Sequence, residues 1–212
     1  MEMRKIYTEY QHNHTLECIL RQSPLFMKAL HLLKDAELSD GWISGGLIRN
    51  TVWNWLHGYD LNKNIADIDI VYCHSTIEDA INDTTLDGYL VEFRNQAFMS
   101  EWYNKTYGVK IPKFESVEQA FPLWSDTCNV ILVRLVGGNL FEIKAPNGVN
   151  DLLSGIIRPR RERMELYGLP ELDYYKRLKK WDIFNEYPYI HVCNSNNEII
   201  NESYVDNIIN II

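Results

Sequence analysis

Two aspartates inside an apolar run constrain this chain more than any other feature. The run is Asp67-Ile68-Asp69-Ile70-Val71-Tyr72, and its β-branched and aromatic residues predict a β-strand. Because residues i and i+2 of a strand share a face, both carboxylates should lie on one side of the sheet. Two neighbouring carboxylates repel each other, and burying both without compensation would be costly. Mg²⁺ (or Mn²⁺) would relieve that cost, because such hard cations prefer oxygen ligands. The alternative is a pair at an exposed strand end.

A glycine pair precedes this strand in the sequence. Residues 41–50 predict a short strand, a tight turn at Gly45-Gly46, and a helix that runs to about His57 and stops at Gly58. Glycine lets a backbone approach a phosphate closely, and a helix N-terminus offers free N–H groups. We therefore expect Ser44 and the glycine pair to hold phosphates. By itself the pair could be an ordinary strand-to-helix turn, and the downstream aspartates favour the phosphate interpretation.

Basic side chains should neutralise those phosphates. Arg49 falls one turn into the helix after the glycine pair, and Lys63 lies in a polar loop before the aspartate strand. We expect both near the phosphates, with a structural brace as the equal alternative for Arg49. Arg134 stands in the apolar run of residues 130–136, where a buried arginine requires a partner. We expect Arg134 to pair with a structural acid.

The glycine pair, the arginine three residues later and the Asp-x-Asp strand together resemble the nucleotidyltransferase superfamily that includes DNA polymerase beta and the tRNA CCA-adding enzymes. More closely, the chain resembles an uncharacterised bacterial nucleotidyltransferase family, formerly a domain of unknown function. Further matching blocks are residues 53–58, Asn95-Gln96-Ala97, Trp102-Tyr103, Ala145-Pro146, Gly148, Asp151, Arg158-Pro159 and Lys180-Trp181. The resemblance implies a polymerase beta-like α+β fold, a mixed central sheet with flanking helices and a helical C-terminal part. It also implies metal-dependent chemistry on a nucleoside triphosphate (NTP).

The superfamily resemblance also implies a third carboxylate on a neighbouring strand. Glu92 and Glu142 both stand between apolar residues. Glu92 is preferred, because it follows the aspartate strand in the order that the superfamily suggests. It would activate the acceptor hydroxyl as a general base or join Asp67 and Asp69 as a metal ligand. The alternative for Glu92 is a surface residue of an edge strand.

These residues predict an enzyme that moves a nucleoside monophosphate (NMP) from an NTP to an acceptor and releases pyrophosphate. The acceptor stays open among a small molecule, an RNA and a protein. A rival hypothesis is a non-catalytic nucleotide-binding or protein-interaction module on the same fold. A basic groove beside the aspartates would favour RNA as the acceptor, and an acidic cleft would favour a cationic small molecule.

The charge balance limits the partners. The net charge of −8 argues against a large nucleic-acid surface, and we expect the basic clusters at residues 158–161 and 176–180 to be solvated. No apolar run is long enough to span a membrane. The scattered cysteines (Cys18, Cys73, Cys128 and Cys193) show no zinc spacing and indicate reduced thiols in a cytoplasmic protein.

Residues 1–190 are predicted to form one α+β domain with a helical C-terminal part, followed by a tail at 191–212. Ser23 and Pro24 should open a helix. Capping boxes at Ser75 with Glu78 and at Ser116 with Gln119 should open two more. The other expected elements are a strand at 89–93, a helix at 96–107, a hairpin at 130–136 and 140–144, and a mostly helical segment at 150–186.

Overall fold

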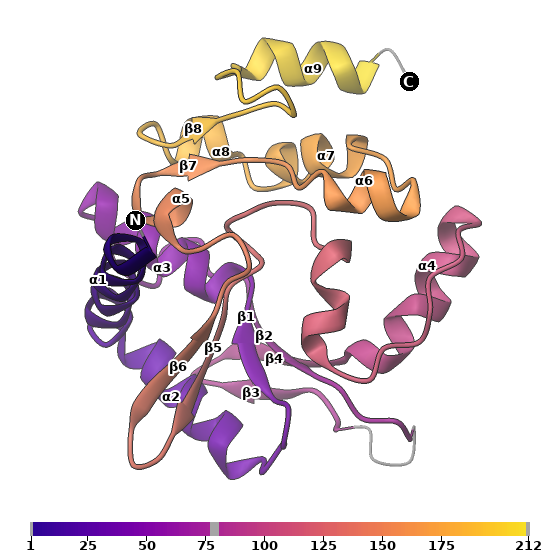
Figure 1. The fold of residues 1–212 in the computed structure, drawn as a ribbon. Helices are drawn as coiled ribbons and strands as arrows, with labels where there is room; N and C mark the ends of the chain where they lie inside the picture. The colour runs from indigo at the N-terminus through magenta and orange to yellow at the C-terminus, as the bar shows by residue number, and fades with distance from the viewer. Residues whose placement is uncertain (1, 77–80, 211–212) are drawn as a thin grey trace.

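The computed structural model describes residues 2–76 and 81–210, with side chains from residue 8 onward. Within those residues, the centre is a six-stranded sheet in the order β3-β4-β2-β1-β5-β6 (Figure 1). Strands β2 and β4 are parallel, and the other neighbouring pairs are antiparallel. The sheet confirms the predicted mixed α+β class. Its strands are β1 (Trp42–Ser44), β2 (Asp67–Tyr72), β3 (Thr84–Leu86), β4 (Tyr89–Asn95), β5 (Leu132–Val136) and β6 (Leu140–Lys144).

Helices flank the sheet, and α2 and α3 pack directly on its central strands. In Figure 1 the elements from α6 to α9, coloured orange to yellow, form a layer above the sheet, and α4 lies at the right. The helices are α1 (Glu2–Leu20), α2 (Pro24–Asp35), α3 (Gly46–His57), α4 (Met99–Tyr107), α5 (Asn150–Leu153), α6 (Glu162–Tyr167), α7 (Leu172–Lys180), α8 (Ile183–Glu186) and α9 (Glu202–Asn210), with 3-10 helices η1 (Gln96–Phe98) and η2 (Val117–Leu123).

One face of the sheet is apolar and forms the main core with α2 and α3. Ile43, Ile68, Ile70, Val91 and Val133 are fully buried on this face. Because side chains alternate along a strand, the residues between them point to the opposite face. That second face carries the polar side chains of the candidate site.

The ends of two helices follow the signals in the sequence. The Ser23 hydroxyl accepts a hydrogen bond from the Phe26 N–H at 3.1 Å, and Pro24 is the first residue of α2. Helix α3 ends at Gly58, whose φ of 66° is readily adopted only by a residue without Cβ. Both predicted boundaries are confirmed.

The capping box predicted for Ser116 and Gln119 is wrong. The Ser116 side chain makes no capping hydrogen bond, and the Gln119 side chain accepts one from the Glu115 N–H at 2.9 Å. The segment η2 is a 3-10 helix with Pro122 inside it, so its first turn lacks the geometry of an α-helical N-terminus.

The predicted helix at 96–107 is divided. A short 3-10 turn, η1, is capped by Asn95, whose side chain accepts a hydrogen bond from the Ala97 N–H at 3.1 Å, and α4 follows. The helix expected to open at Ser75 with Glu78 falls on residues 77–80, which lie outside the described residues. Helix α1 and strand β3 were not predicted.

The C-terminal residues pack back on the molecule. Strand β8 (His191–Val192) pairs in parallel with β7 (Ile156–Ile157). Helix α9 packs on α7, with Val205 fully buried and the Lys179 ammonium 2.6 Å from Glu202 and 2.9 Å from Asp206. Among the helices of residues 2–76 and 81–210, none has the length and apolar character needed to cross a membrane.

Candidate active site

Three strands bring polar side chains together on the second face of the sheet. Ser44 of β1 is the register partner of Asp69 in β2, and Asp69 is the register partner of Glu92 in β4. Side chains of such partners lie about 5 Å apart at Cβ. Asp67 shares this face because it precedes Asp69 by two residues. The strand period therefore places all three predicted carboxylates on one face.

The glycine turn lies directly against Asp69. Gly45 has a φ of 70°, and a Cβ at this residue would lie 2.6 Å from Asp69 Oδ2. Any larger residue would be strained in its backbone and would collide with the carboxylate. Gly46 begins α3, so the free N–H groups of that helix start beside the aspartate strand.

One cavity of about 710 Å³ is lined by both aspartates and by the glycine turn. This volume falls in the range of roughly 300–1,000 Å³ that is typical of ligand pockets. Four basic side chains share the lining, and they come from three separate elements: Arg49 of α3, Arg94 of β4, and Arg177 and Lys180 of α7. The cavity thus combines carboxylates, a glycine turn at the start of a helix and four basic side chains.

Burial and neighbouring acids disfavour the charge of Asp69 in this cavity. Burial, followed by the charges of Asp67 and Glu92, raises the pKa of Asp69 from 3.8 to about 6, although Arg94 and Arg177 lower it. A divalent cation held by Asp67 and Asp69 would remove this repulsion. Mg²⁺ fits the pair, because it is commonly bound by one or two carboxylates together with substrate phosphates.

Glu92 is engaged by a basic neighbour. Its carboxylate forms an ion pair with Arg94, which also lies 3.3 Å from Asp83. Within residues 8–76 and 81–210, no group of three or more His, Cys, Asp and Glu side chains is placed to hold a metal ion together. Glu92 therefore lies beside the aspartates with Arg94 as its present partner.

Glu142, the other candidate for the third carboxylate, lies elsewhere. It belongs to β6 at the far edge of the sheet and pairs with Arg134 at 2.7 Å. The Arg134 guanidinium also donates to the Ser39 carbonyl at 3.0 Å and lies over the Trp42 ring. Arg134 thus has the structural acid that we expected for it.

Arg49 lines the cavity from inside the protein and is 4% exposed. Its Nε donates to Asn50 at 2.9 Å and its Nη1 donates to Asn129 at 2.8 Å. The guanidinium lies over the Trp181 ring, 3.8 Å from the centroid. Burial lowers the pKa of Arg49, and Asp126 acts in the opposite direction. A buried cation faces the same cavity as the glycine turn.

Lys63 is held at one side of this region. Its ammonium is 3.1 Å from Glu186 and 3.9 Å from the centroid of the Tyr59 ring. The neighbouring Asn64 and Glu186 line the cavity. The structure thus gives Lys63 two protein partners next to the predicted phosphate region.

Sequence reasoning missed the division of the basic run at 176–180. Lys179 points to α9 and is paired there, whereas Arg177 and Lys180 line the cavity. These two residues are three apart, which places them on one face of α7. The block Lys180-Trp181 had carried the resemblance, and Trp181 also lines the cavity. Arg94 and Asn129 are two further lining residues that were not predicted.

The sequence matches the model of a protein family described as "Nucleotidyltransferase" over residues 31–192. A solved structure titled "The NMR structure of the protein reveals a CCA-adding enzyme head domain" is similar, with a TM-score of 0.64 and 25% identity, covering 85% of this chain and 94% of that one. A second, titled "Structure of tRNA-processing enzyme complex 3", has a TM-score of 0.50 and 15% identity, covering 86% of this chain and 46% of that one. At such identity the second likeness shows the fold alone. No curated protein sequence gives a significant match.

Proposed function

The chain belongs to this nucleotidyltransferase family, and from that premise we propose that it transfers an NMP group from an NTP to an acceptor in a metal-dependent reaction. The observation that carries the proposal is the meeting of Asp67 and Asp69 with the Gly45-Gly46 turn in one cavity. Carboxylates suit a hard cation, and the turn at the start of α3 suits a phosphate.

The remaining side chains support binding of a triphosphate. Ser44, the glycine turn and Arg49 would contact phosphates on one side, and Arg177 and Lys180 add positive charge from α7. Lys63 would contribute after leaving Glu186. A nucleotide triphosphate carries several negative charges, and the lining cations offset them in a partly enclosed space.

In the proposed reaction, an acceptor oxygen attacks the α-phosphorus, the bond from that phosphorus to the bridging oxygen breaks, and pyrophosphate leaves. Asp67 and Asp69 would hold Mg²⁺ or Mn²⁺, which supplies electrostatic stabilisation of the phosphoryl oxygens when bound. Glu92 would assist, either by taking the proton of the acceptor hydroxyl or as a further metal ligand, once Arg94 has moved from its carboxylate. Positioning and electrostatics supply the rate enhancement.

The charges that line the cavity bear on the class of acceptor. The acids of its α8 side already have partners, because Glu186 pairs with Lys63 and Asp182 accepts a hydrogen bond from Asn185. The cations Arg177 and Lys180 have no ion pair within the described part of the chain. Positive charge of Arg177 and Lys180 that the triphosphate does not neutralise would favour an anionic acceptor, such as an RNA end, over a cationic small molecule.

Labelled nucleotides test the proposal. The purified chain is incubated with each α-labelled NTP, Mg²⁺ and a cell extract as the source of acceptor. Label should enter an acceptor with the wild type and should fall at least about 100-fold with Asp69→Asn, a loss of about 2.7 kcal/mol. Glu142→Gln, which changes a carboxylate outside the cavity, is the matched control and should label normally. Equal labelling by Asp69→Asn and wild type would contradict the assigned role.

The ion pair of Glu92 with Arg94 supports a second candidate, a nucleotide-binding module without catalysis. Calorimetry and pyrophosphate release separate the two. Binding of Mg-NTP with no pyrophosphate released, in the presence of extract, would favour the module. Absence of binding for all four NTPs with Mg²⁺ would contradict both candidates.

A further inference from the structure

Arg49 is a buried cation without a carboxylate against it. Within the described residues no ion pair joins its guanidinium to an acid, and its two hydrogen-bonded partners are the amide oxygens of Asn50 and Asn129. Burying an uncompensated charge costs several kcal/mol, roughly, after relaxation. The groups around Arg49 must therefore offset the cost of burying its charge.

Asp126 is fully buried in the segment that leads from η2 into β5. Its carboxylate accepts four hydrogen bonds: from the N–H groups of Cys128 at 3.1 Å and Asn129 at 3.0 Å, from the Ser125 hydroxyl at 2.9 Å, and from the Asn129 Nδ2 at 2.7 Å. All of these donors are neutral. The charge of Asp126 is therefore solvated by dipoles and is not cancelled by a cation in contact.

The last of these bonds fixes the side chain of Asn129. Because its Nδ2 donates to Asp126, its Oδ1 must point the other way, where it accepts from Arg49. The backbone carbonyl of Asn129 also accepts from the Ser44 hydroxyl at 3.4 Å. Asn129 thus contacts both Ser44, which precedes the glycine turn, and Arg49, which lies in the first turn of α3.

The neutral amide acts as a spacer between the two charges. A carboxylate in direct contact with Arg49 would form a strong paired contact and would satisfy the cation from within the protein. With Asn129 between them, Asp126 still attracts Arg49 over a longer distance and orients it, while the positive charge stays available to the cavity. The guanidinium is held in place on its other side by the Trp181 ring.

We propose that Asp126 and Asn129 are positioning residues for phosphate binding: Asp126 orients the Asn129 amide, which holds Arg49 and Ser44 beside the glycine turn and keeps the Arg49 charge free for the phosphate tail. This inference rests on the proposed function, since the anion is the tail of the NTP. Neither residue touches the reacting atoms. Both act through Arg49 and Ser44.

The test uses the substitution Asn129→Asp. It preserves the size of the side chain, places a carboxylate against Arg49 and removes the amide donor to Asp126. The affinities of ATP, ADP and AMP are measured by calorimetry in Mg²⁺. The wild type should bind ATP more tightly than AMP. In the variant, the ratio of ATP affinity to AMP affinity should fall at least about tenfold, because the Arg49 charge that attracts the phosphates is neutralised. A residue with a merely structural role would weaken all three nucleotides equally.

Two further variants make the result decisive. Asn196→Asp adds the same charge at an exposed asparagine far along the chain and should keep the wild-type ratio of ATP to AMP affinity. Asn129→Ala removes the spacer without adding charge, and it should also lower the ratio. If Asn129→Asp does not fold, as judged by circular dichroism, Asn129→Ala decides.

The outcomes separate this inference from the function on which it rests. A wild type that prefers ATP, together with Asn129 variants that keep the same ratio, would overturn the positioning role alone. A wild type that binds none of the three nucleotides would overturn the proposed function and this inference with it.

Discussion

Two basic segments of the C-terminal half differ in what their charges contact. In residues 158–163 every arginine is tied to the protein: Arg158 to Asp151 and Asn197, Arg160 to the Phe121 carbonyl and Glu162, Arg161 to the Ser195 carbonyl, and Arg163 to the Leu123 carbonyl and Asp173. In residues 176–180, Arg177 and Lys180 line the cavity and have no ion pair among the described residues.

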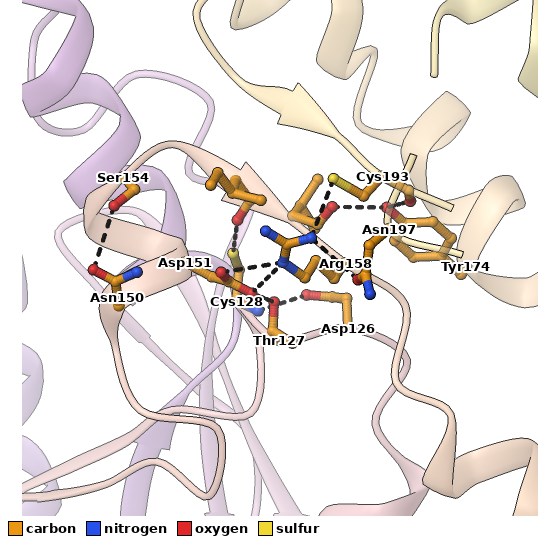
Figure 2. A network of polar contacts seen from close by, with 12 residues as sticks. Asp126, Thr127, Cys128, Asn150, Asp151, Ser154, Arg158, Tyr174, Cys193 and Asn197 are labelled. Atoms are coloured by element: carbon orange, nitrogen blue, oxygen red, sulfur yellow. Dashed lines mark hydrogen bonds and ion pairs between the residues drawn. The ribbon is translucent and has the colours of Figure 1, made fainter. Parts of the chain in front are cut away.

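The difference lies in the acceptors within reach of each segment. Figure 2 shows Arg158 between Asp151 and Asn197, with Cys193 and Tyr174 close by, so this arginine links elements before and after it in the chain. Arginine suits this use, because its planar fork can donate to several acceptors at once. On α7, Tyr174, Tyr175 and Leu178 are buried, whereas Arg177 and Lys180 line the cavity. Residues 158–163, called here the fastening segment, tie the C-terminal layer to the rest of the protein. Residues 176–180 instead supply charge to the cavity through Arg177 and Lys180, the free cations.

The largest expected effect concerns the fastening segment. Arg163→Met should lower the free energy of unfolding by about 3–5 kcal/mol, because it leaves the buried Leu123 carbonyl without its donor and removes the cation from Asp173, which keeps only the Tyr107 hydroxyl. Arg177→Met should change it by less than about 0.5 kcal/mol. Urea denaturation measures both. Equal losses in the two variants would erase the distinction between the segments.

The next largest effect is the pH-dependent cost of burying Asp69, which lines the same cavity as the free cations. The pKa of Asp69 is raised to about 6, so the native state holds this proton more tightly than the unfolded state does. The charge of Asp69 therefore destabilises the fold as pH rises from about 4 to 6, and the full cost is present above that window. Asp69→Asn should raise the free energy of unfolding by about 2–3 kcal/mol at pH 7.5 and by nearly nothing at pH 4.

Urea denaturation at the two pH values measures this effect without added metal. Asp35→Asn, at an exposed aspartate, is the control and should show no pH-dependent gain. A gain for Asp69→Asn that is the same at both pH values would mean that packing, rather than charge, is responsible.

Removal of the free cations should change binding and leave stability alone. The double substitution Arg177→Met with Lys180→Met should weaken Mg-ATP binding by about tenfold or more, about 1.4 kcal/mol, with a smaller dependence on salt. Lys176→Met, on an exposed position of the same helix, should bind as the wild type does. Calorimetry at two salt concentrations checks this, and an unchanged dissociation constant would remove α7 from the site.

The smallest expected effect is the loss of stability on replacing Arg161, which is exposed, in contrast to the buried Arg163 of the same segment. Arg161 donates to the Ser195 carbonyl from an exposed position, so Arg161→Met should cost about 0.5–1 kcal/mol, well below Arg163→Met. The midpoints of urea unfolding measure the difference. A cost as large as that of Arg163→Met would show that the contact matters more than the burial.

The parts of the site that follow local rules could be predicted from the sequence. The strand period placed Asp67 and Asp69 on one face, and the glycine turn and the stop at Gly58 fixed the ends of α3. The same period could have found Arg94, which lies two residues after Glu92 and so shares its face. That signal was present and was missed.

Other features depend on tertiary structure. The division of the run at 176–180 is decided by where α9 docks, and nothing near Lys179 in the sequence shows that its partners are Glu202 and Asp206. Asn129 follows no motif, and its role depends on contacts with Ser44 and Arg49 that are far away in the sequence. The capping box at Ser116 fails because a 3-10 helix follows it, and the Gln119 side chain accepts from the Glu115 N–H instead.

The contact between Gly45 and Asp69 has an evolutionary consequence. Because a Cβ at position 45 would meet the carboxylate at 2.6 Å, a lineage cannot accept a larger residue there and leave Asp69 where it is. Any descendant that changes position 45 must also move the Asp69 carboxylate away from the turn. The identity of this single glycine in related genomes would therefore mark which copies keep the Asp69 carboxylate against the start of α3.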